Sequence, residues 1–313
     1  MKCLIIDEVH SAIAEEFGKY MQVDTKMLPT QQELLALIPA YDVLIMRVDP
    51  AINKEILDAA ANLKVIGVCS VGLNHVDMDT AKAKGIQVFN APGLNANAVA
   101  ELTISKMLDM ARHTIPANHD VKVNKNWDKY KFVGRELRGK TLGILGFGRI
   151  GQLVGRLGRA FGMSVVAYDP YLPAEVFGQQ EAKGMSVDEV LKVADFITIH
   201  VPLNEETKDL FSAASIAGMK NDAVVLNMSR GGIVNEQDMY QALKNGQIGG
   251  YASDVMENEL AAGGLTEGAS FDSPLFECDN FIITPHIGAQ TVDAAYDIGV
   301  HIIAKIKEEL KLA

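Results

Sequence analysis

The feature that most constrains the fold of this chain is a regular alternation of short aliphatic runs with longer stretches of helical periodicity. This alternation is typical of βαβ units, which build parallel sheets covered by helices. The expected strands fall into two series, at 4–6, 43–46, 65–68 and 87–89, and then at 141–145, 165–168, 196–199, 224–226, 250–252 and 281–283. About six strands is typical of a doubly wound dinucleotide-binding domain. The sequence therefore predicts the α/β class, with a first unit of strands and helices and a second domain built on a doubly wound parallel sheet.

The domain boundaries follow from what lies between and after the two series. A chain of 313 residues has room for about two domains. Residues 98–110 carry apolar side chains at helical spacing and are predicted to form one long helix. Residues 291–312 form an amphipathic helical pattern without a strand of their own, and we expect this helix to return to the first domain. The first domain then comprises residues 1–97 and 289–313, and the second comprises residues 98–288.

Charge and cysteine content exclude several classes of protein. Acidic residues outnumber basic ones by 40 to 29, which gives a net charge of −11. Nucleic acids and anionic membranes are therefore poor partners, and an anionic substrate must be bound by a local group of donors. The cysteines at 3, 69 and 278 form no Cys-x-x-Cys pair, so neither a disulfide framework nor a thiolate zinc site is expected. The N-terminal apolar run is too short for a signal peptide and no run is long enough to cross a membrane, which predicts a soluble cytoplasmic protein.

A glycine-rich motif follows the first strand of the second series. Residues 146–151 have the pattern G-x-G-x-x-G and stand between an apolar strand and an apolar helix. The first glycine permits a tight turn, the second lets a pyrophosphate approach the backbone, and the third allows the helix to pack on the strand. The phosphates would lie at the helix N-terminus. A glycine turn with a purely structural role is the alternative, because such turns are common.

Asp169 bears on the choice of cofactor. It follows the next expected strand, close to the spacing of about 20 residues at which an acidic residue binds the adenosine ribose hydroxyls. A 2′-phosphate would meet this carboxylate, and residues 169–173 contain no Arg or Lys to neutralise it. The sequence therefore predicts NAD rather than NADP. The alternative is an Asp that merely occupies a solvated turn before Pro170 and leaves the ribose unbound.

Three side chains after later strands could carry chemistry beside a bound nicotinamide. Arg230 lies in an abrupt glycine turn and could hold a carboxylate or a ketone oxygen with its planar guanidinium. His286 follows the last strand and could act as acid or base near neutral pH. Glu259 beside it would favour the imidazolium form. Each alone has an ordinary alternative, a surface salt bridge for the arginine and a packed or capping role for the histidine.

His200 is another histidine at a strand end, before Val201 and Pro202. We expect it to position the backbone near the cofactor rather than to act as a general acid. A metal site formed by His200, His286 and a carboxylate lacks compact ligand spacing, and no metal is expected.

Several ordered motifs together resemble the D-2-hydroxyacid dehydrogenase family over nearly the whole chain. They are the glycine motif with Asp169, the segments 200–203, 227–232 and 284–289, Asp254 with Glu259, and in the first domain the segments 70–77, 88–93 and 99–102. The resemblance implies two Rossmann-like domains, the first for substrate and the second for NAD, with the active site in the cleft between them. It also implies a homodimer.

The resemblance implies a role for each matching residue. Arg230 would bind the carboxylate and carbonyl oxygen of the substrate, His286 would transfer the proton, and Glu259 would hold His286. Backbone amides at Val71 and Gly72 would bind the substrate carboxylate. The residues that match the NAD site are Gly146, Gly148, Arg149, Ile150, Gly151, Asp169, His200, Pro202, Thr207, Met228, Ser229, Asp254 and Gly288.

Within the family, the segment 127–137, and the run 89–92 with Asn95 after it, resemble the phosphoglycerate dehydrogenase subgroup. Arg47 matches the arginine that such enzymes direct at the substrate phosphate, and Asn95 is a further substrate-binding candidate. Arg47 could instead cap its strand. The Arg-Ser-x-Thr of the subgroup is here Arg47-Val48-Asp49-Pro50, which loses a hydroxyl and gains a carboxylate.

We therefore expect an NAD-dependent oxidoreductase acting on a small anionic 2-hydroxy or 2-keto acid. The first expectation is oxidation of 3-phosphoglycerate to 3-phosphohydroxypyruvate in serine biosynthesis. The alternative is a reductase of glyoxylate, hydroxypyruvate or another small 2-keto acid. A non-catalytic NAD(H)-sensing protein is a remote alternative, because a sensor needs no proton donor.

Two further expectations concern segments outside the motifs. Residues 261–272 form a longer stretch than in the family and could be a lid, an oligomer contact or a spacer without a role. Because the chain ends at Ala313 on the returning helix, no appended regulatory domain is expected.

Overall fold

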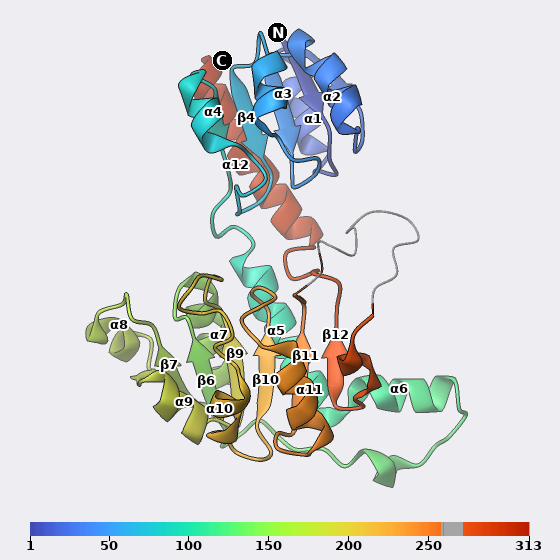
Figure 1. Ribbon diagram of the computed structural model, residues 1–313, viewed down its shortest axis with the longest axis vertical. Coiled ribbons are helices and arrows are strands. Elements are labelled where there is room, and N and C mark those ends of the chain that lie inside the picture. Colours follow the sequence, from blue (N-terminus) through green and yellow to red (C-terminus); the bar gives the residue numbers. More distant parts are fainter. Residues whose placement is uncertain (258, 260–271, 313) are drawn as a thin grey trace. The chain divides into compact units, whose positions relative to one another are not determined.

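The chain folds into two α/β units. The computed structural model describes residues 1–257, 259 and 272–312. Contacts between Cα atoms divide the chain into one unit of Met1–Asn95 with Gln290–Ala313 and a second unit of Ala96–Ala289. Each unit contains one parallel sheet with helices on both faces (Figure 1). The predicted fold class is confirmed.

The first unit is built on a five-stranded parallel sheet in the order β2-β1-β3-β4-β5. Its strands are β1 (Lys2–Ile5), β2 (Gln22–Thr25), β3 (Val43–Met46), β4 (Val65–Val68) and β5 (Gln87–Phe89). Its helices are α1 (Ala12–Phe17), α2 (Gln31–Leu37), α3 (Lys54–Ala59), α4 (Met78–Ala83) and α12 (Val292–Leu310), with a 3-10 turn at Ile38–Ala40. Apolar side chains of α2, α3 and α4 cover one face, and those of α1 and α12 cover the other.

Helix α12 brings the C-terminal end of the chain to the first unit. Thr291 caps its first turn by accepting a hydrogen bond from the backbone N–H of Ala294. The apolar stripe of the helix is buried, with Ile302 and Ile306 wholly inaccessible to solvent. A Cβ atom on Gly67 of β4 would lie 2.7 Å from Ile302 Cγ2. The helix therefore packs directly against the sheet at Gly67, where an added side chain would require the neighbouring isoleucines to shift.

The second unit is built on a seven-stranded parallel sheet in the order β12-β11-β10-β9-β6-β7-β8. Its strands are β6 (Thr141–Leu145), β7 (Ser164–Tyr168), β8 (Lys183–Gly184), β9 (Phe196–Ile199), β10 (Val224–Asn227), β11 (Gly250–Ser253) and β12 (Phe281–Ile283). Its helices are α5 (Ala96–Arg112), α6 (Thr114–Lys122), α7 (Arg149–Ala160), α8 (Ala174–Gln179), α9 (Val187–Val193), α10 (Ala213–Ala217) and α11 (Glu236–Lys244), with 3-10 turns at Lys129–Phe132 and Pro274–Glu277. Side chains of α5, α7 and α8 bury one face, and those of α9, α10 and α11 bury the other.

Two strands were missed by the sequence reasoning, so the expected numbers of four and six strands were wrong. Strand β2 reads Gln-Val-Asp-Thr and is an edge strand with no fully buried residue, so it lacks the aliphatic run that marks an interior strand. Strand β8 has only two residues, both exposed. Both lie at sheet edges and have no fully buried residue, so burial does not impose an apolar pattern on them.

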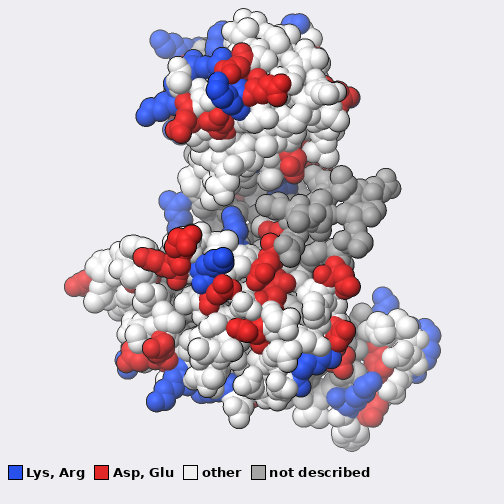
Figure 2. All heavy atoms as spheres, in the orientation of Figure 1, with Lys and Arg blue, Asp and Glu red and all other residues white. Residues whose placement is uncertain are grey.

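The surface agrees with the acidic composition of the chain. On the face that Figure 2 shows, basic and acidic side chains of the described residues are interspersed rather than gathered into one broad basic patch. Within the described part of the chain, no helix is both long enough and apolar enough to cross a lipid bilayer.

Candidate active site

The glycine motif forms the turn from β6 into α7. Gly146 adopts a φ of +90°, which disfavours other residues, and a Cβ there would lie 2.6 Å from the carbonyl carbon of His200. A Cβ on Gly151 would lie 2.2 Å from the carbonyl oxygen of Gly146. In contrast, a Cβ on Gly148 would meet no atom within 4 Å. The first and third glycines are thus required by packing, and the second leaves open space at the N-terminus of α7.

The N-terminus of α7 has the character of an anion site. Gly148 is its N-cap and has no side chain with which to cap the first turn, which begins at Arg149 and Ile150. Amides at a helix N-terminus favour a phosphate. The open space beside Gly148 and these amides fit the pyrophosphate of a dinucleotide.

Asp169 follows β7 and lies against the glycine turn. Its Oδ2 accepts a hydrogen bond from the backbone N–H of Phe147 at 2.9 Å, and its Oδ1 accepts one from Tyr171 N–H at 3.0 Å. A carboxylate has about four acceptor positions, so it can still accept bonds from ribose hydroxyls. Its place beside the open glycine turn fits the ribose of NAD and would repel a 2′-phosphate.

His200 lies at the end of β9, with its backbone against Gly146. Its Nε2 is 2.9 Å from Thr198 Oγ1, and its buried Nδ1 has no hydrogen-bond partner within the described chain. Burial lowers the pKa of His200 to about 3. A ring that stays neutral at physiological pH is a poor general acid, which favours the expected positioning role.

The other residues expected at the cofactor site shape the loops after β9 and β10. Thr207 Oγ1 donates to the carbonyl of Pro202 at 2.6 Å, which closes the loop after His200. Ser229 Oγ donates to the carbonyl of Val201, so the loops after the two strands are tied together. Met228, the first residue after β10, is buried. The structure thus places these residues at neighbouring strand ends, and their contact with a cofactor remains a prediction.

Arg230 lies in the turn after β10. Asn227, the last residue of the strand, stabilises this turn with both polar atoms of its side-chain amide. Its Nδ2 donates to the carbonyl of Arg230 at 2.9 Å, and its Oδ1 accepts from Ser229 N–H at 3.1 Å. The guanidinium of Arg230 is exposed, and its Nη1 donates to the carbonyl of Ser229 at 2.7 Å. The sequence reasoning missed Asn227, although a buried polar residue at the end of an aliphatic strand was a visible signal.

Glu259 and His286 come together from the loops after β11 and β12. His286 Nδ1 lies 3.1 Å from Glu259 Oε1. Since an ionised carboxylate only accepts hydrogen bonds, Nδ1 carries the proton and Nε2 is the nitrogen that can exchange one. Glu259 Oε2 also accepts from the backbone N–H of Met256 at 3.3 Å. The residues predicted as a charge-paired acid or base are therefore in contact, and their catalytic roles stay predictions.

Asp254 anchors the loop that carries His286. Its side chain is 2% exposed. Its Oδ1 accepts from Thr284 Oγ1 at 2.6 Å and from Ile287 N–H at 2.9 Å, and its Oδ2 accepts from Gly288 N–H at 2.7 Å. Both Asp254 and Gly288 were predicted to contact the cofactor. In the structure their side-chain and backbone groups bind each other, and the pair holds His286 in place at a φ of +52°.

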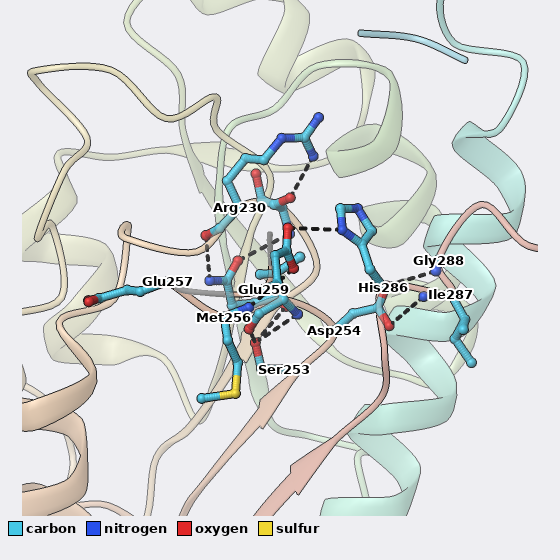
Figure 3. A network of polar contacts seen from close by, with 12 residues as sticks. Arg230, Ser253, Asp254, Met256, Glu257, Glu259, His286, Ile287 and Gly288 are labelled. Carbon is cyan, nitrogen blue, oxygen red and sulfur yellow. Dashed lines mark hydrogen bonds and ion pairs between the residues drawn. The ribbon is translucent and has the colours of Figure 1, made fainter. Parts of the chain in front are cut away.

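Figure 3 shows how these groups are arranged. The Arg230 side chain and the His286 ring rise from separate loops on the same side of the strand ends, with Glu259 between them. Asp254 lies below His286 and faces Ile287 and Gly288. A cation, an acid–base group and its carboxylate partner thus face the solvent side of the carboxyl edge of the sheet, where open α/β sheets bind ligands.

The residues predicted to bind substrate in the first unit lie on loops after its strands. Asp7 Oδ2 accepts from the backbone N–H groups of Arg47, Val48 and Asp49 at 3.0, 2.7 and 3.2 Å, so a single buried carboxylate fixes this loop. Arg47 Nη1 donates to Gln290 Oε1 at 2.7 Å. The sequence reasoning missed Asp7, which stands directly after the first aliphatic run.

The remaining substrate candidates form an exposed stretch of backbone. Val71 is 39% exposed, and a Cβ on Gly72 would meet no atom within 4 Å. The carbonyl of Val71 accepts from Asn90 Nδ2 at 2.7 Å. Asn95 is the last residue of the first stretch of this unit. The segment 261–272, predicted as a lid or contact, lies outside the described residues except for Asp272.

Comparison with known proteins connects this geometry to a family. Residues 104–288 match the model of the D-isomer specific 2-hydroxyacid dehydrogenase, NAD binding domain. The chain is 40% identical to a D-3-phosphoglycerate dehydrogenase from Methanocaldococcus jannaschii, over 99% of this chain and 58% of the relative. It is 39% identical to a hydroxypyruvate reductase from Thermotoga maritima, over 90% of this chain and 88% of the relative. The chain thus spans little more than half the length of the phosphoglycerate dehydrogenase relatives it matches.

A solved structure shows the same architecture. A D-lactate dehydrogenase from Aquifex aeolicus, complexed with NAD and lactic acid, is similar with a TM-score of 0.83 at 29% identity. The similarity covers 99% of this chain and 96% of that one.

Proposed function

Since the chain belongs to the D-isomer specific 2-hydroxyacid dehydrogenase family, we propose that it is an NAD-dependent oxidoreductase. It interconverts a small 2-keto acid and the D-2-hydroxy acid. The observation that carries the proposal is the pair of His286 Nδ1 and Glu259 Oε1 at 3.1 Å, beside the exposed guanidinium of Arg230. A packed or capping histidine would not need a carboxylate partner at a ligand-binding sheet edge. The first unit is assigned to substrate, and the second to NAD.

The chain's own groups account for substrate binding and proton transfer. NAD in its reduced form supplies the hydride that reduces the C2 carbonyl. Arg230 binds the substrate carboxylate and polarises the carbonyl oxygen with its planar donor fork. His286 Nε2 donates a proton to that oxygen during reduction and takes it back during oxidation. Glu259 keeps the ring oriented and stabilises its protonated form.

A purely NAD(H)-sensing protein is the weaker assignment. A sensor has no use for a proton donor, whereas this chain holds His286 on a carboxylate and fixes its loop with Asp254. Turnover of a 2-keto acid with oxidation of NADH separates the two assignments.

The first substrate assignment is 3-phosphoglycerate, oxidised to 3-phosphohydroxypyruvate. Arg47 supports it, because a fixed loop presents this guanidinium at a strand end of the first unit. The relative from Methanocaldococcus jannaschii carries the corresponding name. A planar arginine suits a phosphate group.

Reduction of hydroxypyruvate or glyoxylate is the second candidate. Asp49 lies on the same loop as Arg47, which Asp7 holds in place, and its negative charge would repel a phosphate bound by Arg47. The hydroxypyruvate reductase from Thermotoga maritima is matched over most of its own length.

A substrate panel tests these assignments. NADH oxidation is followed with phosphohydroxypyruvate, hydroxypyruvate, glyoxylate and pyruvate, for the wild type and for Arg47→Ala. If Arg47 binds phosphate, KM for phosphohydroxypyruvate rises about tenfold or more in the variant while KM for hydroxypyruvate is unchanged. Lys54→Ala, which removes an exposed cation of the same unit, is the control. Equal effects on both substrates contradict the phosphate assignment, and inactivity with all four contradicts the proposed function.

We also propose a homodimer. Trp127, Tyr130 and Val133 are 84%, 77% and 75% exposed, so the segment after α6 presents large apolar side chains to solvent. Such clusters mark protein contact sites. Sedimentation equilibrium should give a dimer for the wild type and a weakened dimer for Trp127→Ser, whereas a monomeric wild type contradicts the proposal.

A further inference from the structure

The loops that carry Arg230 and Glu259 touch each other through their backbones. A Cβ on Gly231 would lie 2.0 Å from the carbonyl oxygen of Met256 and 2.6 Å from the backbone nitrogen of Glu257. No side chain fits there without moving one loop. The turn after β10 and the loop after β11 are therefore in direct backbone contact, so a displacement of either would displace the other.

A second connection between the same loops is formed by Glu236, the first residue of α11. Its Oε1 accepts a hydrogen bond from the backbone N–H of Glu257 at 2.8 Å. In return, Glu257 Oε1 accepts a longer one from the backbone N–H of Glu236 at 3.4 Å. Each carboxylate thus binds the other residue's backbone. The Glu257 side chain points away from Glu259 and His286 in Figure 3, so its carboxylate is not part of that pair.

The position of Glu236 is electrostatically unfavourable. Burial raises the pKa of Glu236, and the charges of Glu257 and Glu259 raise it further, while the hydrogen bond from Glu257 lowers it. Burial raises the pKa of the Tyr251 phenol on β11, and the negative charge of Glu236 contributes to this rise. Among the ion pairs of the described residues, none involves Glu236. The Glu236 carboxylate is stabilised there by the hydrogen bond from the backbone N–H of Glu257.

We propose that Glu236 is a positioning residue of the reaction, whose carboxylate holds the loop after β11 where Glu259 meets His286. It touches neither His286 nor the reacting atoms. It acts through the backbone of Glu257, two residues from Glu259, and fixes this loop to the helix that follows the Arg230 turn. The inference rests on the proposed function, because it assigns Glu236 to the same site.

The proposal is tested with Glu236→Leu and Glu236→Gln, and with Gln237→Leu as the control at the next, exposed position of the same helix turn. Glutamine keeps an oxygen acceptor for Glu257 N–H, whereas leucine does not. We expect Glu236→Leu to lower kcat about tenfold or more, because small misplacement of an acid–base group is costly. KM for NADH, kcat of Glu236→Gln and kcat of the control should stay within about twofold of the wild type.

Hydrogen exchange provides a readout that needs no substrate. In the wild type, a peptide containing Glu257 should exchange slowly, and in Glu236→Leu it should exchange at least about tenfold faster while peptides from β9 and α7 are unchanged. Faster exchange throughout the second unit would instead show general destabilisation and would overturn the positioning role. Unchanged exchange at Glu257 would also overturn it.

The pH profile separates the charge from the bond. In the wild type the bond from Glu257 N–H weakens as pH falls and Glu236 takes up a proton, at a higher pH than for an ordinary glutamate. Glu236→Gln has no such proton to gain, so its kcat should persist to lower pH than that of the wild type. Identical acid limbs, or a fully active Glu236→Leu beside an active wild type, contradict the inference. A wild type inactive on every 2-keto acid contradicts the proposed function instead, and the exchange at Glu257 still tests whether Glu236 holds the loop after β11.

Discussion

Replacing Asp254 by asparagine should loosen the loop that carries His286. The carboxylate is buried and accepts three hydrogen bonds, from Thr284 Oγ1, Ile287 N–H and Gly288 N–H. Asparagine keeps one oxygen, which can still serve Thr284 and Ile287. Its amide NH₂ then faces the N–H of Gly288, so two donors are opposed and neither is satisfied.

The size of the effect follows from these contacts. A hydrogen bond to a charged acceptor contributes about 1.5 to 3 kcal/mol, and a buried donor left unsatisfied costs a similar amount. We expect the free energy of unfolding to fall by about 2 to 4 kcal/mol, which lowers Tm on the order of 5 to 10 °C for a domain of this size. Thr284→Val removes one of the three bonds and should cost about half as much.

Urea unfolding, Tm and steady-state kinetics with a 2-keto acid measure these changes. Asp254→Asn should lower kcat about tenfold or more because His286 loses its fixed orientation, while the dissociation constant of NADH changes little. The opposite pattern would refute the reasoning. Normal stability and kcat with weakened NADH binding would mean that Asp254 contacts the cofactor, as the sequence suggested.

Three further substitutions test individual side chains. His286→Ala should lower turnover while NADH fluorescence titration shows nearly unchanged affinity, and lost affinity with normal turnover would count against its role. Asp169→Ala should relax the preference against NADP, measured as the ratio of kcat/KM for the two cofactors, and an unchanged ratio would contradict the assignment. Burial lowers the pKa of His200 from 6.5 to about 3, so the unfolded chain binds a proton that the folded chain does not, and stability is lost as pH falls below 6.5. The unfolding free energy of His200→Asn should therefore fall less steeply than that of the wild type between about pH 6 and about pH 4, and equal slopes would exclude this contribution.

The interior strands could be predicted because a strand that is buried on both faces needs apolar residues along its length. Strands β9 and β10 are mostly apolar because helices cover both faces of the sheet, and the glycine motif marks a turn that few other residues allow. The edge strands β2 and β8 carry no such apolar run and were missed, whereas the edge strands β5 and β12 do carry one and were predicted. The residues of β2 and β8 are not fully buried, and they carry no apolar pattern from which a strand could be inferred.

The candidate site could be predicted only in part, and for a related reason. Arg230, Glu259 and His286 are polar residues directly after strands or in the loops that follow them, where parallel sheets bind ligands. The groups that hold these residues act across long stretches of sequence. Asp254 binds Gly288, 34 residues away, and Glu236 binds Glu257, 21 residues away. One sequence has no signal for such pairs, because nothing local requires their charges.

A crystal structure of the protein with NAD and a D-2-hydroxy acid would show whether His286 and Arg230 act on the substrate. We expect the substrate hydroxyl within about 3.2 Å of His286 Nε2, with Arg230 Nη atoms at the carboxylate and Glu259 still bonded to Nδ1. A ternary complex in which the hydroxyl faces another acid or base, with His286 and Arg230 turned away from the substrate, would contradict this expectation.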